Sequence, residues 1–167
     1  MIISIVPTIQ VENVQEALKQ TAEWMKEGFE GSILKDFDNI FLTHTSPTQL
    51  KLKVAFTVDV RVVGFVEGKR GTKREKTFGS IRYETDDKQI VGSVSGFNDR
   101  ELKTINDNRD YYIGKIIEIE ANDLTKARGS DTFALSHPRF VCLREDKLNS
   151  DNLDRVMLSL DSAKGLK

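Results

Sequence analysis

A change of sequence pattern at Val54 limits the possible folds of this chain more than any other feature. Before it, helical and strand patterns alternate, whereas after it short strand patterns follow one another with almost no helix. These patterns predict one short helix and five strands, over residues 57–66, 77–85, 89–97, 111–120 and 138–144. The helix, over residues 99–105 with Asn98 as its cap, is expected after the third strand.

Five short strands with one helix after the third are typical of a small Greek-key barrel of the OB-fold type. We therefore predict a mainly β protein with some α structure, in which a five-stranded Greek-key OB-fold barrel occupies residues 54–148. Residues 149–167 are expected to form a C-terminal helix and tail. Apolar residues recur at helical spacing from Asn152 to Leu160, which places the helix there.

Residues 1–53 predict a β-α-β-β arrangement. The expected elements are a strand over residues 2–6, a helix from Asn13 to near Gly28, a strand over residues 31–35 and a strand from Gln49. About 50 residues bury too little apolar surface to fold well alone. This segment is therefore predicted to be a partial α+β sheet that belongs to something larger.

Composition excludes several classes of protein. The 167 residues carry a formal net charge of -1, so only a local basic patch could attract nucleic acid. The single cysteine, Cys142, excludes a disulfide within the chain and is expected to be a buried structural thiol, which fits a reducing cytoplasm. No apolar run is long enough to cross a membrane, and the first residues lack the pattern of a secretion signal.

Glu30 begins the first of three clusters of charged residues, E-G-S-I-L-K. In a regular strand, residues 30, 32 and 34 face one way and the alternate residues face the other. Glu30 is therefore expected to approach a ligand, where its carboxylate would suit a hydrated Mg²⁺ ion, while Ile33 packs away. The alternative is a surface carboxylate in a helix-to-strand turn.

The second cluster is L-K-L-K, in which Lys51 and Lys53 are two residues apart. Strand geometry places both lysines on one face, about 6.5–7 Å apart, with Leu50 and Leu52 buried behind them. Two neighbouring ammonium groups repel each other unless an anion lies between them, and a nucleotide phosphate fits that space. The alternative is an edge strand that lysines protect from aggregation.

The third cluster is R-E-D-K, directly after the last predicted strand. Arg144 and Lys147 can grip a polyphosphate, and Asp146 can hold them in place. The alternative is a charged strand end that is simply solvated.

In this order, the three clusters resemble motifs IV, V and VI of the ATP-dependent DNA ligases of the nucleotidyltransferase superfamily. The segments V-D-V-R-V-V-G-F, V-S-G-F-N-D-R-E-L and Y-Y-I-G-K-I-I-E-I-E are similar to the OB domain of those ligases. The resemblance covers about residues 10–148 and is nearest to ligases of large tailed bacteriophages. It implies that residues 1–53 are the C-terminal part of a nucleotidyltransferase (adenylation) domain.

The resemblance also implies roles for single residues in sealing nicks in duplex DNA with ATP and Mg²⁺. Glu30 would help to bind the catalytic metal, and Lys51 and Lys53 would contact the α-phosphate and neutralise its charge. The residues implied in binding the nucleotide and its pyrophosphate are Lys35, Arg144, Asp146 and Lys147. The protein would act in the cytoplasm of a bacterium or of a phage-infected host cell.

The sequence departs from the family pattern in one respect that affects catalysis. Ligases attack ATP with the lysine of K-x-D-G, and no K-x-[DN]-G occurs in these 167 residues. The chain alone is therefore expected not to adenylylate itself. The chain is consistent with a split-gene subunit, a degenerate remnant or a truncated sequence, and the sequence does not choose among these. Its expected partners are nicked double-stranded DNA and, for a split-gene subunit, a separate N-terminal ligase portion that carries K-x-D-G.

A basic loop after the first barrel strand is our candidate for contacts with the DNA backbone. It contains Lys69, Arg70, Lys73, Arg74 and Lys76. The alternative for this loop is an ordinary solvated hairpin.

Two other functions stay open from the sequence. A free-standing, non-catalytic OB-fold DNA-binding protein would present aromatic residues for stacking. In this chain the aromatic residues occupy core-like positions instead, at Phe65, Phe78, Tyr83 and Phe97. An RNA ligase or capping enzyme would share some motifs, but S-G-F-N-D and H-P-R-F favour a DNA ligase.

Overall fold

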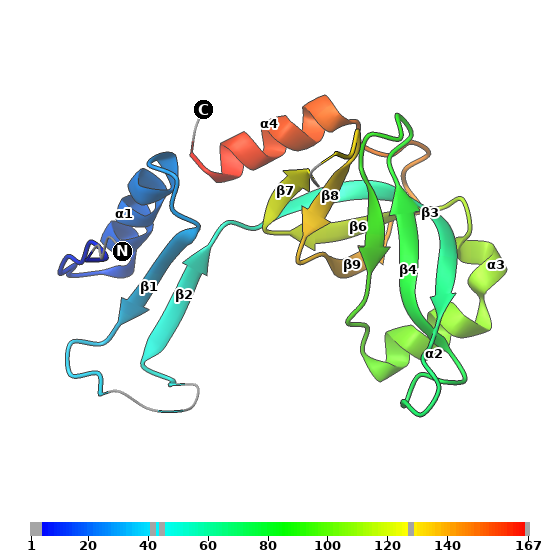
Figure 1. The fold of residues 1–167 in the computed structure, drawn as a ribbon, viewed down its shortest axis with the longest axis horizontal. Coiled ribbons are helices and arrows are strands. Elements are labelled where there is room, and N and C mark those ends of the chain that lie inside the picture. The colour runs from blue at the N-terminus through cyan, green and yellow to red at the C-terminus, as the bar shows by residue number, and fades with distance from the viewer. Residues whose placement is uncertain (1–4, 41–42, 44–45, 127–128, 166–167) are drawn as a thin grey trace. The chain divides into compact units, whose positions relative to one another are not determined.

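The structure, a computed structural model, describes residues 5–40, 43, 46–126 and 129–165. The chain separates into two compact units, residues 1–53 and residues 54–167. Figure 1 shows the elements of each unit. Among the described residues, no helix is long and apolar enough to cross a lipid bilayer.

The first unit contains one helix and one hairpin, α1 (Val14–Lys26), β1 (Gly31–Lys35) and β2 (Gln49–Lys53). Asn13 caps α1 as predicted, because its side chain accepts a hydrogen bond of 3.0 Å from the backbone N–H of Glu16. The helix packs on the hairpin through a hydrogen bond of 2.6 Å between the hydroxyls of Thr21 and Ser32. The predicted strand over residues 2–6 lies partly outside the described residues, and Ile5 and Val6, which are exposed, form no strand.

The second unit is built on a five-stranded antiparallel sheet in the order β5-β4-β3-β6-β9. Its strands are β3 (Phe56–Glu67), β4 (Phe78–Glu84), β5 (Val91–Val94), β6 (Ile116–Ala121) and β9 (Arg139–Leu143). The edge strands β5 and β9 come together at a parallel bridge between Ser95 and Arg139. This strand order confirms the predicted OB-fold, although a bridge rather than a continuous ladder joins the edges.

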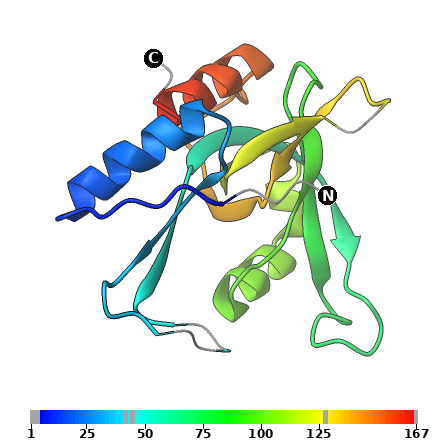
Figure 2. The ribbon, with the colours of Figure 1, turned by 60° about the vertical axis from the view of Figure 1, so that its left-hand side comes forward.

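The barrel core follows from alternation along β3. Phe56, Val58, Val60 and Val62 are buried, and they pack with apolar residues of the neighbouring strands. Helix α2 (Asp99–Asp107) follows the third strand as predicted, with a capping box between Asn98 and Glu101. Figures 1 and 2 show α2 at one end of the barrel and the C-terminal helix at the other.

The predicted strand over residues 111–120 begins later than expected. Tyr111 and Tyr112 belong to a short helix, α3 (Arg109–Tyr112), and β6 starts at Ile116. The chain turns between them at Gly114, whose φ of +81° favours glycine. The aromatic pair looked like a strand because aromatic residues are enriched in strands, but the turn at Gly114 prevents the strand from extending.

Two further elements complete the unit. The hairpin β7 (Asp123–Lys126) and β8 (Phe133–Ser136) lies between β6 and β9 and was not predicted. Half of the eight residues in these two strands are polar, and only Leu135 among them is buried, so no clear strand pattern marks the hairpin in the sequence. Helix α4 (Leu153–Ala163) has Asn152 as its cap and buries Val156 and Leu160, as the helical spacing predicted.

Candidate functional site

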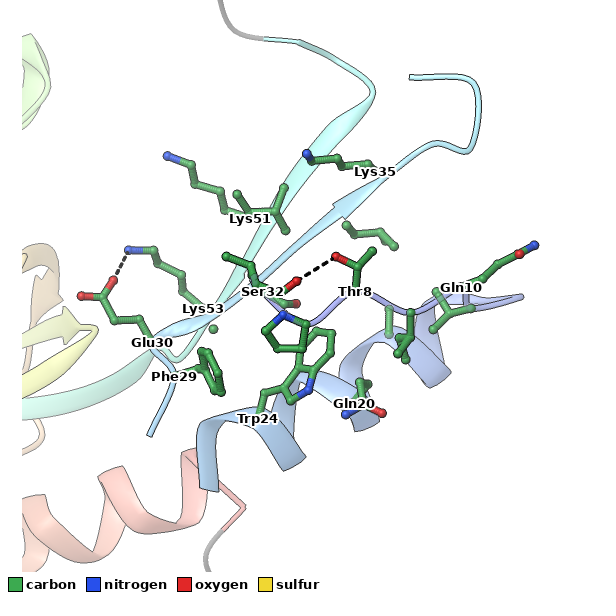
Figure 3. A pocket seen from close by; sticks show the side chains of 18 of the residues that line it. Thr8, Gln10, Gln20, Trp24, Phe29, Glu30, Ser32, Lys35, Lys51 and Lys53 are labelled. Atoms are coloured by element: carbon green, nitrogen blue, oxygen red, sulfur yellow. Dashed lines mark hydrogen bonds and ion pairs between the residues drawn. The ribbon is translucent and has the colours of Figure 1, made fainter. Parts of the chain in front are cut away.

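Lys35, Lys51 and Lys53 form what we call the lysine face of the β1–β2 hairpin. The register pairs Lys53 with Gly31 and Lys51 with Ile33, and paired residues project on the same side of a sheet. All three lysines are exposed. Figure 3 shows their side chains extending away from α1 and Trp24. The structure thus brings together the two lysines of the second cluster and adds Lys35.

Glu30 lies at the end of the lysine face. Gly31, with φ +149°, permits a close approach of the strands here, because a Cβ atom would lie 2.1 Å from the carbonyl oxygen of Leu52. Lys53 Nζ donates to Glu30 Oε2 at 3.4 Å, and the Glu30 side chain is 91% exposed. An exposed pair of this kind contributes about 0–1 kcal/mol. A charged ligand can therefore separate Glu30 from Lys53.

Two predictions about the hairpin are wrong. Ile33 was expected to pack away from the ligand, but it shares the lysine face and is 54% exposed. Leu50 was expected to be buried, but it is 58% exposed. Ile33 is exposed because α1 covers the opposite face of the hairpin. Leu50 lies on the same face as Ser32, which contacts α1, but no further strand extends the hairpin to cover it within the described residues.

A cavity of about 880 Å³ lies in the first unit. The extended segment 6–11, α1 and the hairpin line it, and Trp24 and Phe29 supply aromatic surface. Glu30, Lys51 and Lys53 are also among the lining residues (Figure 3). Apolar surface with a few charged groups is the usual composition of a small-molecule site.

The described residues contain no group of three His, Cys, Asp or Glu side chains that could hold a metal ion. Glu30 supplies one carboxylate. Because Mg²⁺ commonly uses one or two carboxylates together with water and substrate phosphates, Glu30 fits a shared site and not a complete one.

In the second unit, Arg144 follows β9 and contacts three carboxylates. Its Nε and Nη2 donate to the two oxygens of Asp146 at 2.9 and 2.8 Å. Its Nη1 donates to Asp59 Oδ1 and to Glu118 Oε2, both at 3.2 Å. Lys147 donates to the other oxygen of Asp59. We call these five residues the Arg144 cluster.

Asp59 is the most buried member of the cluster. Its side chain is 6% exposed, compared with 24% for Arg144 and 65% for Asp146. The register places Asp59 opposite Glu118 across β3 and β6, where two like charges repel each other. Arg144 bridges both carboxylates and therefore compensates for this repulsion.

Sequence reasoning missed Asp59 and Glu118. They lie 85 and 26 residues from Arg144 in the chain, so only strand pairing brings them together. One signal was present, because Asp59 interrupts the apolar strand between Val58 and Val60. A carboxylate that the fold buries at such a position requires a cationic partner.

Arg144 and Asp146 stabilise each other's charged forms. The hydrogen bonds from Arg144 lower the pKa of Asp146 to about 2. The hydrogen bonds to Asp146, with the charges of Asp59 and Glu118, raise the pKa of Arg144 above its ordinary value. Neither of these two groups titrates near pH 7, so the pair between Arg144 and Asp146 stays charged at neutral pH.

Cys142 borders the Arg144 cluster and is half-buried rather than fully buried as predicted. Burial raises the pKa of its thiol, and the nearby carboxylate of Glu118 raises it further. The thiol donates to Glu118 Oε2 at 3.7 Å. A protonated thiol of this kind is a poor nucleophile.

The basic loop between β3 and β4 contains two kinds of residue. Lys69, Arg70, Lys73 and Lys76 are exposed. Arg74 is half-buried and donates to the backbone carbonyls of Gly79 at 3.2 Å and Phe97 at 3.4 Å. Arg74 therefore stabilises the loop, while the exposed residues are free to contact a phosphate backbone.

The four aromatic residues singled out from the sequence, Phe65, Phe78, Tyr83 and Phe97, pack in or against the barrel core and form no stacking surface. Phe78 lies edge-on to Phe65 and to Phe97, with ring centroids 5.1 Å apart in each pair. Burial raises the pKa of Tyr83 to about 12. These four residues are thus unsuited to stacking on bases.

Comparison with known proteins relates the chain to DNA ligases, although no protein-family model matches it. The DNA ligases of Enterobacteria phages T4 and T6 are each 30% identical to it over 165 residues. The match covers 93% of this chain and 34% of each ligase. The chain therefore spans about a third of the length of these relatives.

Solved structures show a similar fold. The structure named "Pmar-Lig_Pre." matches with a TM-score of 0.70 and 28% identity, over 78% of this chain and 30% of that one. The structure described as "DNA binding with a minimal scaffold: Structure-function analysis of Lig E DNA ligases" matches with a TM-score of 0.66 over 81% of this chain and 48% of that one. At 18% identity, this second match shows the fold alone. The phage sequences and the first of these structures show that the chain is homologous to the C-terminal part of a DNA ligase.

Proposed function

We propose that the chain serves as the C-terminal part of an ATP-dependent DNA ligase that seals nicks in duplex DNA. In this proposal, residues 1–53 complete a nucleotidyltransferase domain and residues 54–148 form the OB domain. The lysine face, with Glu30 at its end, is the observation that carries the proposal. Three exposed ammonium groups on one hairpin face are suited to binding a polyphosphate.

The lysines would act through charge. During adenylate transfer, negative charge develops on the oxygens around the α-phosphorus, and fixed cations stabilise it. Lys51 and Lys53 are the proposed α-phosphate contacts, and Lys35 would bind the nucleotide further along the same face. In the described residues, neither Lys35 nor Lys51 forms an ion pair that a nucleotide would have to break.

Glu30 would contribute one carboxylate to a Mg²⁺ site. Its exposure and its weak pair with Lys53 leave it available for that role. The phosphates of ATP and groups outside these 167 residues would supply the other ligands. When bound, the metal would polarise the phosphate oxygens and so assist the lysines.

Arg144 and Lys147 are the proposed contacts of the second unit with ATP, and Asp146 of the same motif would orient Arg144 before the nucleotide binds. The guanidinium of Arg144 and the ammonium of Lys147 would bind the pyrophosphate portion. No K-x-D-G occurs in the sequence, so the attacking lysine must come from another ligase segment. Such a segment and nicked DNA are therefore the proposed partners.

Reconstitution tests the proposal. The chain alone, incubated with labelled ATP and Mg²⁺, should form no covalent AMP. Addition of the N-terminal portion of a phage DNA ligase, which carries K-x-D-G, should produce lysyl-AMP and sealed nicks. Nick sealing is the informative readout, because it requires both portions to act together.

The substitution Lys53→Ala should lower the rate of adenylylation in that mixture by about 10²–10³-fold, the effect of removing one preorganised charge. Lys19→Ala, which removes an exposed lysine on α1, is the matched control and should change the rate less than about twofold. Labelled AMP on the chain alone would contradict the proposal. DNA binding by the chain without any sealing in the mixture would favour a non-catalytic OB-fold protein.

A further inference from the structure

We propose that Arg144 has a fixed edge and an exchangeable edge. Asp59 and Glu118 act as positioning residues that hold Nη1, while Asp146 occupies the Nε–Nη2 edge until a phosphate ligand displaces it. This inference rests on the proposed function and extends it to two residues, Asp59 and Glu118, that lie outside the three charged clusters.

The fixed edge follows from burial. Asp59 has a side chain that is 6% exposed and accepts from both Arg144 and Lys147. Its backbone N–H also donates to Asp151 at 2.9 Å, which ties this part of β3 to the segment before α4. Separation of Arg144 from Asp59 would leave a buried carboxylate poorly paired, which is strongly unfavourable. The Nη1 contacts are therefore expected to persist when a ligand binds.

The exchangeable edge follows from exposure and geometry. Asp146 is 65% exposed and follows Arg144 by two residues in a turn. Its two oxygens accept from Nε and Nη2 at 2.9 and 2.8 Å, a parallel pair of hydrogen bonds. A phosphate binds the same fork of a guanidinium in the same way. Asp146 thus occupies the position that a phosphate would take.

Charge balance requires the exchange. Two cations, Arg144 and Lys147, face three carboxylates in the cluster. An incoming polyphosphate would meet a net negative charge if Asp146 stayed in place. Its departure leaves two cations and two carboxylates, with one guanidinium edge open to the ligand.

The first test compares two neighbouring carboxylates in the full 167-residue chain. The Nε–H signal of Arg144 is followed by ¹⁵N NMR while inorganic pyrophosphate is added at constant ionic strength. Asp146→Asn should bind pyrophosphate about tenfold more tightly than wild type, as expected if the edge is open in about a tenth of wild-type molecules. Glu145→Gln removes the same charge one residue away, where the carboxylate accepts from Tyr111, and should change affinity less than about twofold.

The second test uses the sign of the effect at Asp59. Electrostatics alone predicts that Asp59→Asn, which removes a negative charge, strengthens pyrophosphate binding. Loss of the fixed edge predicts weaker binding, by at least about threefold, together with broadening of the Arg144 Nε–H signal. Glu118→Gln removes the other Nη1 acceptor and should act in the same direction. It provides the test if Asp59→Asn does not fold.

Three results would overturn the inference. They are an unperturbed Arg144 signal in wild type, equal affinities for Asp146→Asn and Glu145→Gln, or tighter binding in both Asp59→Asn and Glu118→Gln. The titration needs no attacking lysine and no DNA. If the titration succeeds and the reconstituted mixture does not form lysyl-AMP, the proposed ligase function is wrong while the two-edged arrangement of Arg144 stands.

Discussion

The two units of the chain differ in how well they cover their own apolar side chains. In the second unit, Val60, Ile117 and Ile119 have no exposed surface. In the described part of the first unit, the buried residues are Ala17, Thr21 and Ser46, which include no large apolar side chain. The first unit therefore has a capped helix and a hairpin without the core that normally supports them.

The same contrast holds for the charged residues. The cations of the lysine face project from an exposed hairpin, and Glu30 is their one close carboxylate within the described residues. The cations of the Arg144 cluster are held by carboxylates of β3 and β6, one of them buried. A complete core thus allows a protein to fix the position of a cationic side chain. An isolated hairpin fixes only the face of the sheet from which the cationic side chain projects.

The largest expected effect is on folding of the separate units. Residues 54–167 should unfold cooperatively when expressed alone, because the buried side chains of the barrel belong to that segment. Residues 1–53 alone should show no cooperative transition, because so small a segment with so little burial cannot offset the loss of chain entropy. Circular dichroism during heating measures both. A sharp transition for residues 1–53 would remove the contrast between the units.

A matched pair of isoleucines should show the next largest effect. Ile119→Ala in β6 removes a side chain with no exposed surface and should cost about 2–5 kcal/mol of unfolding free energy. Ile33→Ala in β1, where the side chain is 54% exposed, should cost less than about 1 kcal/mol. Urea unfolding of the full chain gives both values. Similar losses at the two positions would mean that the lysine face is covered in solution.

The helices and strands that could be predicted from the sequence are those that a local pattern of residues marks. Alternation along β3, the caps at Asn13 and Asn98 and the helical spacing after Asn152 predicted the main elements, and the succession of these elements predicted the OB-fold. The hairpin β7–β8 was not predicted, because its pairing buries little apolar surface and leaves no periodic pattern in the sequence. The contacts of Arg144 with Asp59 and Glu118 were not predicted, because contacts between residues far apart in the chain leave no local pattern.

The basic loop should show a smaller effect on DNA binding. Alanine at Lys69, Arg70, Lys73 and Lys76 should weaken binding of nicked duplex. It should also reduce the slope of log K against log salt by about 0.9 for each phosphate that the loop no longer neutralises. Fluorescence anisotropy at several salt concentrations measures the slope. Alanine at four other exposed cations, Lys19, Lys26, Arg100 and Lys103, should leave it nearly unchanged.

Arg74 serves as a separate control within the same loop. Because it donates to the carbonyls of Gly79 and Phe97, Arg74→Ala should lower the melting temperature more than it changes the salt slope. If the variant with four alanines in the loop keeps the wild-type slope of log K against log salt, DNA binding belongs to another surface of the barrel unit.

The smallest expected effect is the pH dependence that Asp146 contributes. Its pKa is lowered from 3.8 to about 2 in the folded protein by the hydrogen bonds from Arg144. A carboxyl group with a depressed pKa binds protons more readily in the unfolded state, so its stabilising contribution is complete above about pH 4 and is lost as pH falls toward 2. Wild type should therefore melt at a higher temperature than Asp146→Asn near pH 6, and the difference should shrink between pH 4 and pH 2. Because Asp146 is exposed, the difference should be small and should decrease with added salt. A difference that stays constant down to pH 2 would show that the pair with Arg144 does not depend on charge, and the exchangeable edge would then lose its physical basis.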